Sequence, residues 1–341
     1  MLARFSSQDD ELPQLHTLEL TSERNSWWPK PKQLETLSIA LGSWCIKALN
    51  FDLTHLKKIT LGNCSLKECL DVLRVAPLLT TCTLIQCYKH DKEDIDLQLP
   101  PQPIAYPNIQ TFQIDLYAPD TLDCISSFFL FPSLKTLSLT YSRKAVRVDA
   151  SSIVRLLKEF QCPLGTLTLT FDRVELPSEG FAPLFLELPG LRHLQLYFSR
   201  DNHMPSNAIL SLLSEFSEAN VDGIKQPRYL PSLHSLKFTT TKFRDWSKLP
   251  DMFGAYTAND HTFIQHRCAL KNVMISSRSD YPPRVSKKNP DPSSVYPIDE
   301  ETLKRILWLG DYGGVKWCLQ GERIKDDIIG LGKKWYGIGG S

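Results

Sequence analysis

A short leucine-based phrase recurs along this chain and constrains its fold more than any other feature. It reads FPSLKTLSL at residues 131–139 and returns with the same spacing as LPSLHSLKF at residues 230–238. The two copies share an apolar residue, a proline and then two leucines three positions apart, with a further apolar residue, Leu139 or Phe238, two positions later. Self-similarity at a spacing of roughly 20 to 40 residues is typical of stacked supersecondary units, and a Leu-x-x-Leu-x-Leu core is typical of the leucine-rich kind.

Ten degenerate copies of this phrase can be traced along the chain. In each copy the first apolar residue is followed by core positions three and five residues later, and this alternation predicts a short strand with one buried face. Stacked copies predict an α/β fold, a leucine-rich-repeat solenoid with a curved parallel sheet on its concave side and helices and loops on its convex side. The first apolar residues of the copies are Leu15, Leu34, Leu56, Leu79, Ile109, Leu134, Leu164, Leu191, Leu233 and Leu270.

Helical patterns follow several of these strands. Ser65 and Glu68 have the spacing of a capping box, and a proline before most copies of the phrase ends the preceding helix. Two polar or mixed insertions, 217–229 and 253–267, are predicted to be excursions on one face. Helices are expected at 65–76, 120–129, 150–160, 206–216, 246–256 and after Asp299, and a final strand is expected at 315–319.

The repeat signal divides the chain into four segments. Residues 1–11 are an N-terminal extension, and residues 12–278 are a solenoid of about ten irregular repeats. Residues 279–297 are rich in Pro, Ser and Lys without periodicity, which predicts a linker or long loop. Residues 298–341 are predicted to be the C-terminal capping segment that a solenoid needs to cover its last layer.

The charge balance and the absence of targeting signals limit the classes of partner. The chain has 341 residues and a formal net charge of +1, which gives no global attraction to nucleic acid or to an acidic membrane surface. The N-terminus lacks an apolar signal region, and no later run approaches the ~18 apolar residues of a membrane span. We therefore expect a soluble cytoplasmic or nuclear protein that binds neither nucleic acid nor membranes.

Four of the nine cysteines form a C-x4-C-x12-C-x4-C pattern at Cys64, Cys69, Cys82 and Cys87. This spacing admits a zinc site, but the repeat accounts for it better. Cys64 and Cys87 fall where the repeat places a small polar residue turned toward loop backbone groups, and Cys82 replaces a core leucine. We favour the structural interpretation, and reduced thiols fit the expected compartment.

Enzyme motifs are absent from the sequence. There is no G-x-S-x-G, no H-E-x-x-H and no Walker loop, since Gly332 and Lys333 lack the other residues that a phosphate-binding loop needs. His261, His266 and Cys268 lie close enough in sequence to share a metal, but they fall in a predicted insertion. We expect a chain without catalytic activity, cofactor or metal.

The predicted partner-binding residues lie on the concave face and along one rim. Threonine and serine dominate the outward strand positions, as expected of a solvated strand face. The exceptions with longer side chains include His193, Tyr197 and Lys237. A basic residue also stands four positions after the last strand leucine in successive repeats, at Arg143, Arg173, Arg200 and Lys242.

Equivalent positions in stacked repeats lie about 5 Å apart, so these cations are predicted to form a ladder along the rim. Arginine rows bind phosphate or carboxylate groups through paired hydrogen bonds. The ladder therefore predicts an acidic or phosphorylated protein partner. In the alternative interpretation, the rim residues pair locally with Asp172, Asp201 or Asp245 and face solvent.

The Pro-x-Leu-x-x-Leu-x-Leu units, their irregular lengths, the loop cysteines and the tail segment LKRILW at residues 303–308 resemble the large fungal family of F-box proteins with degenerate leucine-rich repeats. In that family the repeats recruit a substrate to a cullin-type ubiquitin ligase, and an N-terminal F-box binds the ligase adaptor. No F-box-like helix bundle precedes Leu12, so we expect the adaptor not to bind this chain. The alternative is a structural or truncated repeat protein with no ligase recruitment and no partner of its own.

Overall fold

The computed structural model describes most of the predicted repeats. It covers residues 16–20, 33–39, 52–87, 102–116, 121–142, 150–172, 180–199, 206–218, 225–240, 246–257, 262–277 and 298–321, with the single residues 329 and 333. Predictions for the segments 1–11 and 279–297 lie outside the described residues.

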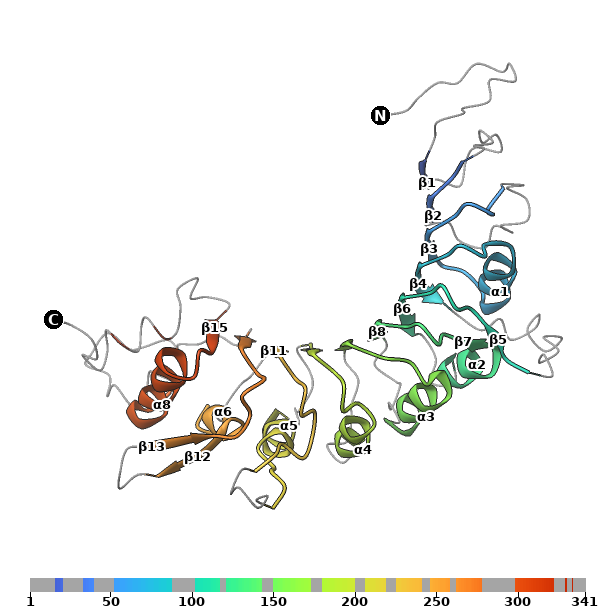
Figure 1. Ribbon diagram of the computed structural model, residues 1–341. Coiled ribbons are helices and arrows are strands. Elements are labelled where there is room, and N and C mark those ends of the chain that lie inside the picture. The colour runs from blue at the N-terminus through green and yellow to red at the C-terminus, as the bar shows by residue number, and fades with distance from the viewer. Residues whose placement is uncertain are drawn as a thin grey trace. The chain divides into compact units, whose positions relative to one another are not determined.

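The main element is a parallel sheet of eleven strands, in which each strand lies beside the next strand of the sheet along the chain (Figure 1). The predicted α/β class and all ten repeat strands are confirmed, and so is the final strand. In order, the strands are β1 (Thr17–Leu20), β2 (Thr36–Ile39), β3 (Lys58–Gly62), β4 (Thr81–Cys87), β6 (Thr111–Leu116), β8 (Thr136–Tyr141), β9 (Thr166–Phe171), β10 (His193–Phe198), β11 (Ser235–Thr240), β14 (Asn272–Ser277) and β15 (Lys316–Gly321).

The chain divides into two compact units. The first unit comprises Met1–Leu134 with Phe160–Cys162, and the second comprises Lys135–Glu159 with Pro163–Ser341. Strands β1 to β6 therefore belong to the first unit, and strands β8 to β15 belong to the second. A two-stranded sheet of β5 (Ile104–Ala105) and β7 (Phe129–Leu130) also lies in the first unit.

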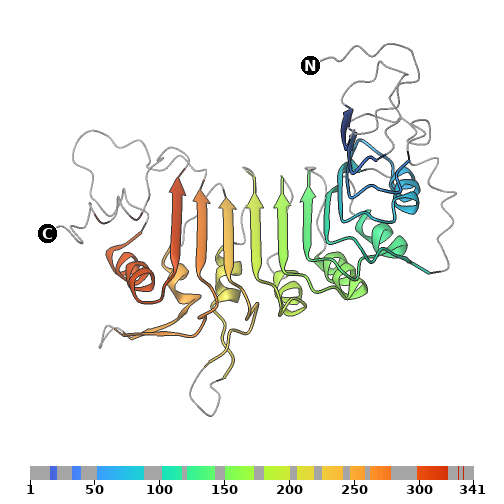
Figure 2. The same ribbon diagram turned by 45° about the horizontal axis from the view of Figure 1, so that its top comes forward.

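Seven helices connect or follow the strands in the described part of the chain. In the second unit they lie on one face of the sheet (Figure 2), because the leucines on that face need an apolar layer to cover them. The helices are α1 (Leu66–Val75), α2 (Thr121–Phe128), α3 (Ala150–Phe160), α4 (Phe181–Leu186), α5 (Ser206–Leu213), α6 (Lys248–Asp251) and α8 (Glu300–Asp311).

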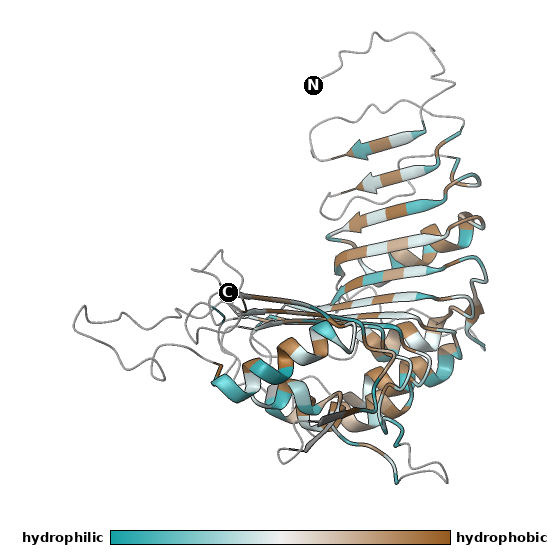
Figure 3. Ribbon diagram, turned by 60° about the vertical axis from the view of Figure 1, so that its left-hand side comes forward, coloured by the Kyte–Doolittle hydropathy of each residue, from teal (hydrophilic) through white to brown (hydrophobic). Residues whose placement is uncertain are grey.

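Leucine positions of successive strands stack in register to form the core. In the first unit Leu37, Ile59, Cys82 and Phe112 are paired from strand to strand, and each is at most 1% exposed. In the second unit the matching set is Leu137, Leu167, Leu194, Leu236 and Val273. Figure 3 shows the alternation as brown and paler bands along the strands. Cys82 takes a core position, as predicted.

The predicted capping box begins α1. The Ser65 hydroxyl accepts a hydrogen bond from the Glu68 backbone N–H at 3.2 Å, and the Ser65 N–H donates to Glu68 Oε2 at 2.8 Å. Two donors that a helix start leaves without partners are thereby satisfied.

Helix α4 is absent from the sequence prediction because Pro183 reads as a helix breaker. In the structure Gly180 is the N-cap, so Pro183 stands in the first turn. Backbone N–H groups there have no intrahelical partner, and proline costs little at such a position. The helix buries Phe181, Leu184 and Phe185.

The helix expected at 246–256 is confirmed at 248–251, and the prediction is wrong for the residues that follow. Helix α6 ends at Asp251, and β12 (Gly254–Thr257) then pairs with β13 (Thr262–Gln265) in an antiparallel hairpin. Gly254 has a φ of +156°, and a Cβ on it would lie 1.9 Å from the Ile264 carbonyl oxygen. The close approach of the two strands therefore requires glycine. The insertion predicted as a polar excursion is in part this hairpin.

Arg267, at the base of the hairpin, is 1% exposed. Its guanidinium donates hydrogen bonds to the carbonyl oxygens of Leu213, Tyr229 and Met252 at 2.8, 3.0 and 3.1 Å. Burial lowers the pKa of Arg267 to about 10, so the group remains charged at neutral pH. Arg267 thus joins the end of α5, the segment before β11 and the end of α6.

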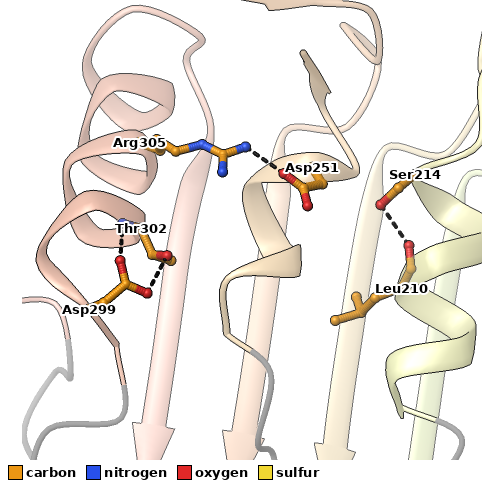
Figure 4. A network of polar contacts seen from close by, with 6 residues as sticks. All are labelled: Leu210, Ser214, Asp251, Asp299, Thr302 and Arg305. Atoms are coloured by element: carbon orange, nitrogen blue, oxygen red, sulfur yellow. Dashed lines mark hydrogen bonds and ion pairs between the residues drawn. The ribbon is translucent and has the colours of Figure 1, made fainter. Parts of the chain in front are cut away.

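Polar contacts attach α8 to its neighbour in the second unit (Figure 4). Asp299 is the N-cap and accepts from the Thr302 N–H at 2.8 Å and from the Thr302 hydroxyl at 2.7 Å. Arg305 forms an ion pair of 2.5 Å with Asp251 of α6. Strand β15, which follows α8, pairs with β14, so residues 298–321 form an integral layer of this unit.

Candidate functional site

The candidate site is the open face of the second unit, which we define as the strand positions of β8, β9, β10, β11, β14 and β15 that alternate with the buried leucines. Where they are described, these side chains are half-exposed or exposed, except for Thr239 at 6%. The strand register arranges them in rows that cross the sheet. The first row is Thr136, Thr166, His193, Ser235, Asn272 and Lys316, and the second is Ser138, Thr168, Gln195, Lys237, Met274 and Cys318.

The open face lacks negative charge. The six strands contain no aspartate or glutamate, and their ionisable side chains with a basic nitrogen are His193, Lys237 and Lys316. The first unit differs, because Glu19 lies in β1 and Asp115 lies in β6. Any electrostatic attraction at the open face is therefore directed toward anions.

A second basic group adjoins the open face where the strands begin. Successive strand starts are linked by backbone hydrogen bonds: Gly165 donates to Lys135, Arg192 to Gly165, His234 to Arg192, Lys271 to His234 and Lys316 to Lys271, at 2.7–2.9 Å. We call the basic row the side chains of Lys135, Arg192, His234 and Lys271, which directly precede their strands, together with Lys316, which stands one position further along in the first row of the open face, in register with Asn272. All are exposed except Lys271, which is half-buried.

Short-range contacts order the centre of the site. The Lys237 Nζ lies 5.2 Å from the Tyr197 ring centroid, and the Tyr197 hydroxyl donates to Gln195 Oε1 at 3.0 Å. The ring centroids of His193 and His234 are 6.2 Å apart. A cation held over an aromatic ring is positioned without losing its charge. Strands β10 and β11 thus carry a tyrosine and a lysine that are arranged before any partner binds.

The structure brings together three of the residues predicted from the sequence, since His193 and Tyr197 on β10 lie beside Lys237 on β11. The other predicted site residues are Arg143, Arg173, Arg200 and Lys242, which lie outside the described residues, so the rim ladder stays a prediction. The aromatic residues two positions before Arg143, Arg173 and Arg200 belong to the core. Tyr141, Phe171 and Phe198 are at most 3% exposed and stack at 5.5 and 5.2 Å.

Sequence reasoning missed the basic row because it considered the strand positions and the strand ends. A usable signal was present at one repeat position. The residue directly after the first leucine of the phrase is Lys135, Gly165, Arg192, His234 and Lys271 in five successive repeats. Comparison of that position between repeats predicts a mainly basic row.

Three of the cysteines of the C-x4-C-x12-C-x4-C pattern, Cys64, Cys69 and Cys82, are buried in the first unit. Cys64 Sγ lies 3.3 Å from Cys69 Sγ and 3.9 Å from the Leu61 carbonyl oxygen, in keeping with a loop position turned inward. Burial raises the pKa of the Cys82 thiol above its usual value, which disfavours the thiolate that binds metals. Within the described ranges, no group of three or more His, Cys, Asp or Glu side chains is arranged to hold a metal ion.

Comparison with protein-family models and with curated proteins found no match to this chain. No helix in the described part of the chain has the length and apolar character needed to cross a membrane.

Proposed function

We propose that this chain is a non-catalytic protein-interaction module of the leucine-rich-repeat type, which binds a protein partner through the open face of the second unit. The observation that carries the proposal is a six-strand polar face without acidic residues, centred on the ordered pair Tyr197 and Lys237. Tyrosine is enriched among the residues that dominate binding energy in interfaces, and Lys237 adds a positively charged group held against the Tyr197 ring.

The strand architecture suits this role. A sheet whose strands succeed one another along the chain presents equivalent positions side by side, which gives an extended surface rather than one deep pocket. The absence of carboxylates on the six strands leaves His193 without an acidic neighbour there that could orient it for acid-base work. Both features support binding over catalysis.

The resemblance to F-box proteins with degenerate repeats extends the proposal to substrate recruitment for a ubiquitin ligase. This part is tested separately, by asking whether a ligase adaptor co-purifies with the chain. We expect the chain to capture a partner without the adaptor, and co-purification of the adaptor would contradict that expectation.

The interaction proposal is tested by affinity purification with three immobilised proteins. They are the wild-type chain, the open-face variant Tyr197→Ser with Lys237→Glu, and the control Lys67→Glu, which reverses an exposed charge on α1. We expect proteins captured by the wild type and the control to be lost from the open-face variant. Equal capture by all three would refute the proposal, and capture of nothing would favour the structural alternative.

A further inference from the structure

We propose that the basic row, Lys135, Arg192, His234, Lys271 and Lys316, binds an extended acidic segment of a protein partner that crosses the strands. The inference rests on the proposed function and names the chemistry of the partner. It is carried by the placement of the row beside a face without acidic residues, and it involves no residue of the predicted rim.

The spacing of the row fits several separate carboxylates. Neighbouring strands lie about 4.8 Å apart, so Lys135 and Lys271, four strand spacings apart, are separated by about 19 Å. An extended segment rises about 3.3 Å per residue, and therefore about six residues span this distance. Side chains on one side of such a segment recur about every 6.6 Å, a period comparable with the spacing of the cations.

The side chains of the row are spread out instead of converging on one point. Lys271 Nζ donates to the Gly313 carbonyl oxygen at 2.9 Å, which directs this ammonium toward the loop after α8. Gly165 contributes no side chain and leaves a gap between Lys135 and Arg192. A single phosphate group is best bound by cations that converge on it, so the arrangement favours a string of carboxylates.

The face beside the row favours a peptide over a nucleic acid. Single-stranded nucleic acids bind to grooves in which bases stack on exposed aromatic rings. The aromatic side chain in the open-face rows is that of Tyr197, and Lys237 already lies over its ring. The remaining positions are mostly hydroxyl or amide side chains, which can hydrogen-bond the backbone and polar side chains of a peptide.

The proposal is tested by fluorescence anisotropy with labelled probes at low ionic strength. The main probe is an alternating Glu-Ser peptide of about ten residues, long enough to span the row. A Gln-Ser peptide of equal length, the same Gln-Ser peptide with one central phosphoserine, and an oligothymidylate are the comparison probes. We expect saturable binding of the Glu-Ser peptide that weakens as salt is added.

The test variant is Arg192→Glu with Lys316→Glu, two exposed residues whose reversal disturbs no described ion pair. The control is Lys58→Glu with Lys67→Glu in the first unit, which changes the net charge by the same amount. We expect at least a tenfold loss of affinity for the test variant and no change for the control. The neutral pair Arg192→Gln with Lys316→Gln repeats the test if charge reversal lowers the unfolding temperature.

Equal affinity of the test variant and the wild type would overturn the proposal, and so would tighter binding of the phosphoserine peptide or the oligothymidylate. Failure of the peptide to bind, while partner capture still depends on Tyr197 and Lys237, would reject the acidic segment and leave the proposed function standing. If the Glu-Ser peptide fails to bind and partner capture does not depend on Tyr197 and Lys237, both proposals are rejected.

Discussion

Arg267 Nη1 donates a hydrogen bond of 2.7 Å to the carbonyl oxygen of Leu230, a residue in the left-handed region with a φ of +48°. Leu230 opens the second copy of the leucine phrase. Its counterpart in the first copy, Phe131, is not among the described residues with a positive φ. A non-glycine residue in this region is strained by the order of 1–3 kcal/mol, so the charged donor holds a conformation that the repeat alone does not require.

Replacement of Arg267 by methionine should therefore lower the free energy of unfolding by about 2 to 4 kcal/mol, because four buried carbonyl groups lose a charged donor. Urea unfolding followed by circular dichroism measures the change. Arg228→Met is the control, since Arg228 is exposed and pairs with Glu215 at 3.1 Å, and it should cost no more than about 1 kcal/mol. Equal losses for both variants would contradict a special role for Arg267.

The burial of the strand positions could be predicted from the sequence, whereas the burial of Arg267 could not. Strand positions were predictable because the alternation at Leu137 and Leu139, and at its equivalents, reports burial directly. The burial of Arg267 was not predictable, because arginine is rarely buried. The partners of Arg267 are backbone carbonyl groups, and every residue type has one, so the pattern of side chains does not indicate them. Its nearest partner along the chain is 15 residues away, and the farthest is 54.

The candidate site was partly predictable for a related reason. His193, Tyr197 and Lys237 stand out from a hydroxyl-rich face, and parallel strands in register bring them together. The contact of Lys237 with the Tyr197 ring depends on rotamers, and the sequence does not specify those. The basic row needed a comparison between repeats at a position before the strand.

Truncation of Leu137 to alanine tests the core assignment of the phrase. Leu137 is fully buried, so we expect a loss of about 2 to 5 kcal/mol in the free energy of unfolding. Thr136, its neighbour on the open face, is half-buried, and Thr136→Ala should change stability by about 0.5 kcal/mol or less. Similar losses at both positions, measured by thermal unfolding, would argue against a sheet with one buried face.

The ion pair between Glu35 and Lys57 in the first unit predicts a measurable pKa shift. The Lys57 Nζ donates to Glu35 Oε1 at 2.8 Å, and this hydrogen bond, with the lysine charge, lowers the pKa of Glu35 below its usual 4.5. A lowered folded-state pKa contributes stability above the usual value, and the contribution is lost as the pH falls through the lowered value.

An NMR titration of the Glu35 carboxyl should show its pKa move upward in Lys57→Met. The neighbouring Lys58→Met, which removes a charge without removing the hydrogen bond, should leave most of the shift in place. If the two variants gave the same pKa for Glu35, the lowered pKa would be caused by the positive charge of nearby lysines and not by the hydrogen bond from Lys57.

Cysteine reactivity should follow burial. The thiolate is the reactive form, and burial raises the pKa of Cys82, which is 1% exposed, whereas Cys268 is exposed. Brief treatment of the native chain with iodoacetamide, followed by peptide mass mapping, should therefore modify Cys268 well before Cys64, Cys69 or Cys82. In denaturant the four should react at similar rates. Early modification of Cys82 in the native chain would mean that this layer of the first unit opens readily, because the solvent can reach the thiol only when its covering side chains move away.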